Sequence, residues 1–199
     1  EDCHIVISNS LDEYIISELL RQGAKIDAFG VGERLITAKS DPVFGCVYKL
    51  AACEGKDGRI IPKIKVSENE AKITNPHIKN VYRFYSMESG KAEADLLTLH
   101  DEYLDDSAPI ELFDPDFTWK RKTMTNYTLR SLLVPVFKDG ALVYKKPPIA
   151  EIRDHCRREL DTMWDEVLRF DNPHKYYVDL SEKLWFLKHS MISEIKSMK

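Results

Sequence analysis

The sequence contains no apolar run close to the roughly 18 residues that a membrane-spanning helix requires, and no charged-then-apolar leader opens it. It also lacks a long block of one charge sign. The 29 basic and 33 acidic residues are interspersed and give a net charge of −4, which argues against binding to a polyanion. We therefore expect a soluble protein whose partners include neither a membrane nor nucleic acid.

Cysteine is scarce, and none of the four cysteines belongs to a C-x-x-C pair. Their scatter in a chain of this size is typical of reduced thiols in a cytoplasmic protein. The six histidines show no H-x-x-x-H spacing, so we predict no metal site and no catalytic histidine among them.

With 199 residues and 43% hydrophobic content, the chain is long enough to bury the core of one domain or two small ones. The first residue is Glu1, not Met, and an apolar run follows almost at once. We therefore expect that a segment preceded this chain.

The N-terminal stretch has the pattern of a β-strand, an α-helix and a second β-strand. Ile5-Val6-Ile7 and residues 26–29 are short apolar runs, and the apolar positions of 11–22 between them have helical spacing. Ser10-x-x-Glu13 fits a capping box and Gly23 suits the helix end. This pattern predicts a βαβ unit with two parallel strands, its helix packed against both.

A turn with two glycines, Gly30-Val31-Gly32, follows the second predicted strand. Such a turn lets the backbone approach an anion and direct amide N–H groups at it, although glycine pairs also occur in simple tight turns. A dinucleotide fingerprint would need a third glycine where Leu35 stands. Residues 33–39 can form only a short helix before Asp41-Pro42, and such a helix after a late barrel strand often helps to bind phosphate.

Ser8 and Asn9 follow the first predicted strand, at the position from which side chains of a (β/α) barrel reach a ligand. The alternative is that they only cap the next helix. Because Ser10 already offers that cap, contact with a ligand stays open for both residues.

From Cys46 onward the pattern changes to short alternating runs typical of an antiparallel sheet. These runs are 47–53, 60–66, 81–85 and 96–99, with a hairpin formed by 132–137 and 141–144. Pro147-Pro148 then opens a predicted helix of about twenty residues with an apolar stripe. We expect a final helix to begin at Asp179, with Asp179 and Glu182 as its cap.

Four stretches resemble nicotinate phosphoribosyltransferases, and they stand in that family's order. They are Ile7-Ser8-Asn9-Ser10-Leu11-Asp12-Glu13, Gly23 to Thr37 around Phe29-Gly30-Val31-Gly32-Glu33-Arg34-Leu35, Asp41 to Leu50, and Asn172-Pro173-His174-Lys175-Tyr176 with Val178-Asp179-Leu180-Ser181. The resemblance runs over nearly the whole chain but covers only the C-terminal part of the family's chain.

The resemblance implies an α/β fold: the C-terminal part of a (β/α) barrel of the type II phosphoribosyltransferase kind, followed by an antiparallel β layer and C-terminal helices. Residues 1–45 would hold the last βα units of the barrel, 46–145 the β extension and 146–199 the helical segment. It also implies a cytoplasmic homodimeric enzyme of NAD biosynthesis. That enzyme joins nicotinate to phosphoribosyl pyrophosphate with coupled ATP hydrolysis, and Mg²⁺ serves the pyrophosphate.

By the same resemblance, Ser8, Asn9, Gly30 and Gly32 hold the 5-phosphate of phosphoribosyl pyrophosphate. Glu33 stands where many family members have Thr, so we expect only its backbone N–H to bind and its side chain to point away or be offset by Arg34. The family's phosphorylated histidine matches none of the six histidines here. No catalytic residue is therefore assigned, and the segment alone is expected to be inactive.

Two other functions stay open at this point. One is a phosphate-ligand binding module without chemistry. The other is a related phosphoribosyltransferase that acts on nicotinamide or quinolinate, although the Asp41 to Leu50 and Val178 to Ser181 stretches favour nicotinate.

Overall fold

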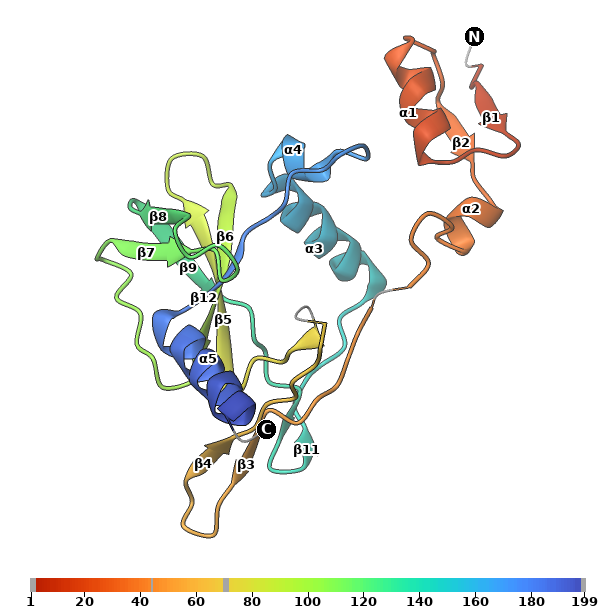
Figure 1. Cartoon of the computed structure of the whole chain (residues 1–199). Helices are drawn as coiled ribbons and strands as arrows, with labels where there is room; N and C mark the ends of the chain where they lie inside the picture. The colour runs from red at the N-terminus through yellow and green to blue at the C-terminus, as the bar shows by residue number, and fades with distance from the viewer. Residues whose placement is uncertain (1–2, 44, 70–71, 198–199) are drawn as a thin grey trace. The chain divides into compact units, whose positions relative to one another are not determined.

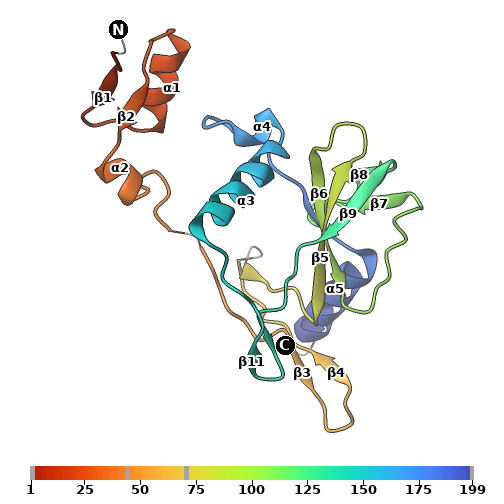
Figure 2. The same ribbon diagram turned by 180° about the vertical axis from the view of Figure 1, so that it is seen from behind.

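The chain folds into two compact units, Glu1–Tyr48 and Lys49–Lys199, seen from opposite sides in Figures 1 and 2. They are taken from a computed structural model that describes residues 3–43, 45–69 and 72–197. The expected division at 45/46 and 145/146 stays a prediction.

The first unit is the predicted βαβ arrangement. Strand β1 (Val6–Ser8) pairs in parallel with β2 (Ala28–Gly30), and helix α1 (Glu13–Arg21) connects them. The short helix α2 (Glu33–Ile36) follows β2 directly, as predicted. The two strands are parallel as in a barrel repeat, but by themselves they do not form a barrel.

Helix α1 begins two residues later than the capping box predicted. Asp12, not Ser10, is the N-cap, and its Oδ1 accepts a hydrogen bond from the Ile15 N–H at 2.9 Å. Asn9 and Ser10 both have positive φ, so the chain turns there before the helix can start. The predicted end is confirmed, because Gly23 has a φ of 81° and donates its N–H to the Leu20 carbonyl.

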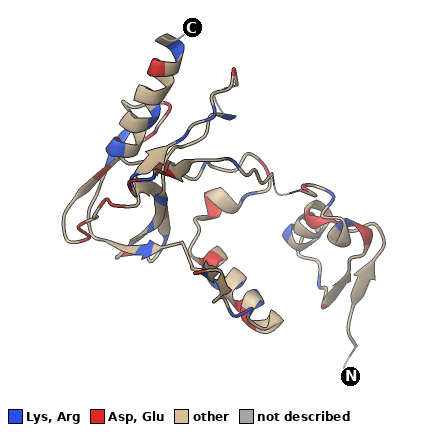
Figure 3. Cartoon of the chain, turned by 90° about the horizontal axis from the view of Figure 1, so that it is seen from below, with Lys and Arg blue, Asp and Glu red and all other residues tan. Residues whose placement is uncertain are grey.

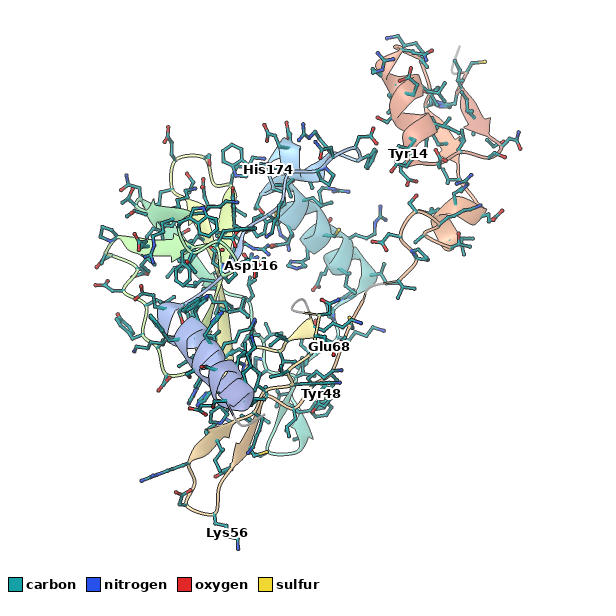
Figure 4. The ribbon with its side chains drawn as sticks, viewed as in Figure 1. Tyr14, Tyr48, Lys56, Glu68, Asp116 and His174 are labelled. Atoms are coloured by element: carbon teal, nitrogen blue, oxygen red, sulfur yellow. The ribbon has the colours of Figure 1, made fainter. Side chains whose placement is uncertain are left out.

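The first unit buries very little of its apolar surface. Leu11 is its one buried hydrophobic residue among those described, and α1 has no buried residue. Ile16 and Leu19 of α1 are half-buried, whereas Ile15 and Leu20 are exposed, because two strands of three residues are too narrow to cover the whole apolar face of the helix. Tyr14 on α1 is an example of an exposed aromatic side chain (Figure 4).

The second unit is built on a four-stranded sheet with the order β12-β6-β5-β9. Its strands are β5 (Lys79–Ser86), β6 (Ala92–Leu99), β9 (Tyr127–Ser131) and β12 (Val178–Leu180). Strand β5 is antiparallel to both neighbours, but β12 is parallel to β6. The predicted antiparallel layer is therefore a mixed sheet, because the chain enters β12 from the end of the sheet where β6 begins.

Three two-stranded pairs accompany this sheet. They are β3 (Ala52–Glu54) with β4 (Ile60–Pro62), β7 (Ile110–Phe113) with β8 (Arg121–Met124), and β10 (Phe137–Lys138) with β11 (Ala141–Leu142). The β10–β11 pair confirms the predicted hairpin in shortened form, without Pro135. The sequence did not predict β7, β8 or β9, whose short runs mix charged and apolar residues.

The core lies between one face of the sheet and the β7–β8 pair. Its buried cluster is Phe84, Ala94, Leu96, Leu112, Met124 and Tyr127. The rings of Phe84 and Tyr127 lie 4.9 Å apart in a tilted arrangement, which adds a specific aromatic contact to the burial of apolar area.

The α-helices in the described part of the second unit are α3 (Ile149–Asp161), α4 (Asp165–Leu168) and α5 (Glu182–Ser197). The predicted twenty-residue helix ends at Asp161, where the Lys91 ammonium donates to the carbonyls of Asp161 and Met163. The predicted apolar stripe of α3 is not buried either.

The final helix begins at Glu182, not at Asp179. The Ser181 hydroxyl accepts a hydrogen bond from the Leu184 N–H at 3.2 Å and provides the cap. Asp179 lies instead in β12, where its side chain is buried.

Candidate functional site

The predicted phosphate-site residues lie together at one end of the β1–β2 pair. Ser8 and Gly30 are direct partners in the parallel register, and each is the last residue of its strand. Asn9 and the Val31-Gly32 turn follow at the same edge, since parallel strands end on the same side. The structure thus brings Ser8, Asn9, Gly30 and Gly32 into one place, although they are more than twenty positions apart in the sequence.

The two glycines have different roles. A Cβ atom on Gly30 would lie 3.0 Å from the Ser8 Cβ, so glycine is needed there for the close approach of the strands. A Cβ atom on Gly32 would meet nothing within 4 Å. Packing therefore accounts for Gly30, whereas the space beside Gly32 is open to a ligand.

Several hydrogen-bonding groups around this turn are uncommitted. The side chains of Ser8 and Asn9 have no partner among the residues that the structure describes. Gly32 is the N-cap of α2, and the first N–H groups of a helix, here those of Glu33 and Arg34, have no acceptor within the helix. Hydroxyl, amide and backbone N–H donors are the groups that bind phosphate.

The charged side chains near the turn are arranged differently from the prediction. Arg34 does not offset Glu33; its guanidinium lies 3.6 Å from the Asp12 carboxylate and links α2 to the start of α1. The Thr37 hydroxyl donates to the Glu33 carbonyl at 2.8 Å and so belongs to the end of α2. Glu33 keeps an exposed side chain at the first position of α2.

The rings of His77 and His100 stack on each other, and the His189 ring stacks on that of Trp185. His174, labelled in Figure 4, lies after α4 and donates its backbone N–H to the Glu166 carbonyl. In the parts of the chain that the structure describes, no three His, Cys, Asp or Glu residues are grouped to hold a metal ion. All four cysteines are free.

A buried polar network that the sequence did not predict joins α3 to the sheet. The Arg83 guanidinium makes two hydrogen bonds, of 2.8 and 2.9 Å, with the Asp95 carboxylate, and Tyr176 donates its hydroxyl to the same carboxylate at 3.0 Å. Glu159 of α3 accepts from Arg83 and from Arg130. The hydrogen bonds that Arg83 donates to Asp95 raise the pKa of Arg83, and burial, followed by the charge of Asp95, raises the pKa of Tyr176. The network positions α3 against the sheet through the ion pairs of Glu159 with Arg83 and Arg130.

Comparison with known proteins identifies the family. Residues 78–188, more than half of the chain, match the family described as "Nicotinate phosphoribosyltransferase C-terminal domain". The chain belongs to the nicotinate phosphoribosyltransferase family. This match lies entirely in the second unit, whereas the predicted phosphate turn lies in the first.

Relatives named nicotinate phosphoribosyltransferase are similar to both units. The Bacillus subtilis (strain 168) protein is 39% identical over 196 residues, covering 98% of this chain and 40% of its own. The Dictyostelium discoideum protein is 32% identical over 210 residues, covering 100% of this chain and 35% of its own. The chain thus spans about two fifths or less of the curated relatives that it matches.

The fold is also similar to that of a solved structure. The crystal structure of human nicotinic acid phosphoribosyltransferase superposes with a TM-score of 0.70 at 24% identity, covering 95% of this chain and 33% of that chain. At this identity the similarity establishes the α/β fold of this member of the nicotinate phosphoribosyltransferase family.

Proposed function

We propose that this chain forms the C-terminal part of an enzyme that joins nicotinate to phosphoribosyl pyrophosphate with coupled ATP hydrolysis, in cytoplasmic NAD biosynthesis. Its βαβ unit would then be the last part of a (β/α) barrel. The observation that carries the proposal is the pairing of Ser8 with Gly30 beside the open space at Gly32. Family membership supports it.

In this proposal the chain's own residues bind and orient the substrate. Ser8, Asn9 and the N–H groups of the turn would hold the 5-phosphate and so fix the position of the ribose. Hydrogen bonds to a charged phosphate are stronger than those between neutral groups. The exposed Glu33 carboxylate would turn away from the phosphate, leaving its backbone N–H to contribute.

The Mg²⁺ that accompanies the pyrophosphate in the family has no evident site in the described residues, where no cluster of three suitable ligands is present. No step assigned to this chain involves the metal.

The described helices include none that is long and apolar enough to cross a membrane.

Replacing Gly32 in the complete enzyme tests the proposed site. Gly32→Val places a branched side chain in the open space, and loss of one charge-assisted hydrogen bond, worth about 1.5–3 kcal/mol, should raise the dissociation constant for phosphoribosyl pyrophosphate about 10- to 100-fold. The affinity for nicotinate should not change. Calorimetric titration of a variant with a cooperative melt gives both values.

Gly45→Val is the matched control, because a Cβ atom there also meets nothing within 4 Å and the position lies outside the turn. It should bind phosphoribosyl pyrophosphate as the wild type does. A folded Gly32→Val enzyme with wild-type affinity would show that the turn is structural and that the phosphate lies elsewhere.

The complete enzyme is also expected to be a homodimer, as the family resemblance implied. The segment around the β10–β11 pair supports this proposal, because it exposes several large apolar side chains, which a stable interface would cover. They are Leu133, Val134, Phe137 and Leu142. Sedimentation equilibrium should give twice the monomer mass for active enzyme, and a monomeric active enzyme would refute the expectation.

A further inference from the structure

A cavity of about 380 Å³ lies in the Lys49–Lys199 unit and is lined by residues of β6, β7, β8 and β12. Its apolar wall includes Ala94 and Leu112 of the core cluster. Its charged wall is formed by Glu93, Asp114, Lys120, Arg121, Lys122 and Asp179. None of these residues belongs to the phosphate turn.

The register of β12 places Asp179 on the core face of the sheet. Asp179 is the direct partner of Leu96, a member of the core cluster, and paired residues of adjacent strands point to the same face. Val178 and Leu180 point to the opposite face, where both line the space beside α5. The Asp179 carboxylate therefore lies on the same face of the sheet as the apolar core cluster, and it lines the cavity.

Asp179 is a buried residue whose carboxylate lines the cavity and has no partner among the described residues. The residue is only 6% exposed, and within residues 3–43, 45–69 and 72–197 its side chain accepts no hydrogen bond and forms no ion pair. A carboxylate that is largely removed from water and has no hydrogen-bond donor is costly. Most such groups in proteins are satisfied by a partner.

Asp114, an acidic residue that also lines the cavity, cannot satisfy Asp179 and has partners of its own. Its Oδ1 accepts the N–H groups of Asp116 and Phe117 at 2.9 and 3.1 Å and closes the loop between β7 and β8. Burial opposes ionisation of Asp114, but these hydrogen bonds lower its pKa. Asp114 therefore stays ionised and adds negative charge beside Asp179.

The basic residues of the cavity are already paired. Arg121 binds the Glu111 carboxylate and Lys122 binds Glu93. The Lys120 ammonium lies over the Phe117 ring, 4.3 Å from its centroid. Lys175 acts on Asp179 only through longer-range attraction. An anion could bind here only by breaking the existing interactions of these basic residues. A cation, in contrast, can bind the Asp179 carboxylate, which has no partner in the described part of the chain.

We propose that this cavity binds an ammonium or guanidinium group, which donates hydrogen bonds to Asp179 while its attached carbon chain packs along Ala94 and Leu112. The group comes either from a small amine or from a Lys or Arg side chain of another polypeptide segment. The proposal does not depend on phosphate binding in the βαβ unit.

The test is a carbon-13 NMR titration of the aspartate carboxyl groups in the 199-residue chain, with the Asp179 signal assigned by its loss in Asp179→Asn. Burial and then Asp114 raise the pKa of Asp179 to about 6. A saturating cation that prefers the carboxylate tenfold over the acid lowers this midpoint by about one pH unit. We expect that shift with ethylammonium or methylguanidinium chloride.

Tetramethylammonium chloride at equal ionic strength is the control for charge without an N–H donor, and it should leave the midpoint in place. An equal shift with tetramethylammonium, or no shift with either donor cation, would overturn the proposal. Asp171→Asn, at an exposed position, should respond to ethylammonium as the wild type does.

A blocked tripeptide, acetyl-Gly-Lys-Gly-amide, separates the two sources of the group. At least tenfold tighter binding than ethylammonium, with the same midpoint shift, assigns the site to a side chain of a polypeptide. Equal or weaker binding with that shift assigns it to a small amine. In either case Asp179→Asn, checked by its thermal melt, must lose the binding.

Discussion

Asp95→Ala is expected to lower the free energy of unfolding of the Lys49–Lys199 unit by about 3–5 kcal/mol, the range for breaking a buried ion pair. The side chains of Arg83 and Asp95 are only 15% and 11% exposed. Removing the carboxylate leaves the Arg83 guanidinium buried with Glu159 as its remaining acidic partner, and it leaves the Tyr176 hydroxyl without its acceptor. Urea denaturation followed by circular dichroism measures the loss.

Glu111→Ala is the matched control for this experiment. It breaks the pair of Glu111 with Arg121, whose side chains are 48% and 43% exposed, and exposed pairs contribute about 1 kcal/mol or less. Basic and acidic residues are scattered over the ribbon (Figure 3), so burial is the property that distinguishes the two pairs. Equal losses in both variants would show that the Arg83 network is no more than a surface ion pair.

Asp179→Asn is expected to stabilise the same unit, and to do so only at higher pH. The pKa of the folded Asp179 is about 6, against 3.8 ordinarily. Between these values the folded chain binds more protons than the unfolded chain, so wild-type stability falls as pH rises through this window. Above this window, ionisation of Asp179 lowers the free energy of unfolding by about 3 kcal/mol, at about 1.4 kcal/mol per pKa unit. Asparagine does not titrate and avoids this cost.

The difference in unfolding free energy between Asp179→Asn and the wild type should therefore grow by about 2 kcal/mol from pH 4 to pH 7.5. Urea denaturation at both pH values measures it, with Asp171→Asn expected to show no such trend. A pH-independent difference would mean that ionisation of Asp179 is not what costs stability. If Asp179→Asn is more stable but no longer binds the cation, then Asp179 reduces stability and serves to bind a ligand.

The local features of the βαβ unit could be predicted from the sequence because each depends on neighbouring residues. Apolar spacing over 11–22 determines α1, and Gly23 ends it by adopting a positive φ that other residues avoid. The order of the motifs around Ser8 and Gly30 was enough to indicate the family. The exact cap could not be predicted, since Ser10 and Asp12 are both good capping residues and only the turn at Asn9 selects Asp12.

Tertiary structure alone decided the features that depend on residues distant in the sequence. The sequence Val178-Asp179-Leu180 fits a helix start as well as a strand, and pairing with β6 made it a strand and turned Asp179 toward the core. Helix α3 is joined to the sheet through Glu159 and its ion pairs with Arg83 and Arg130. Local periodicity carries no information about such pairings, because their energy comes from groups that only the folded chain brings together.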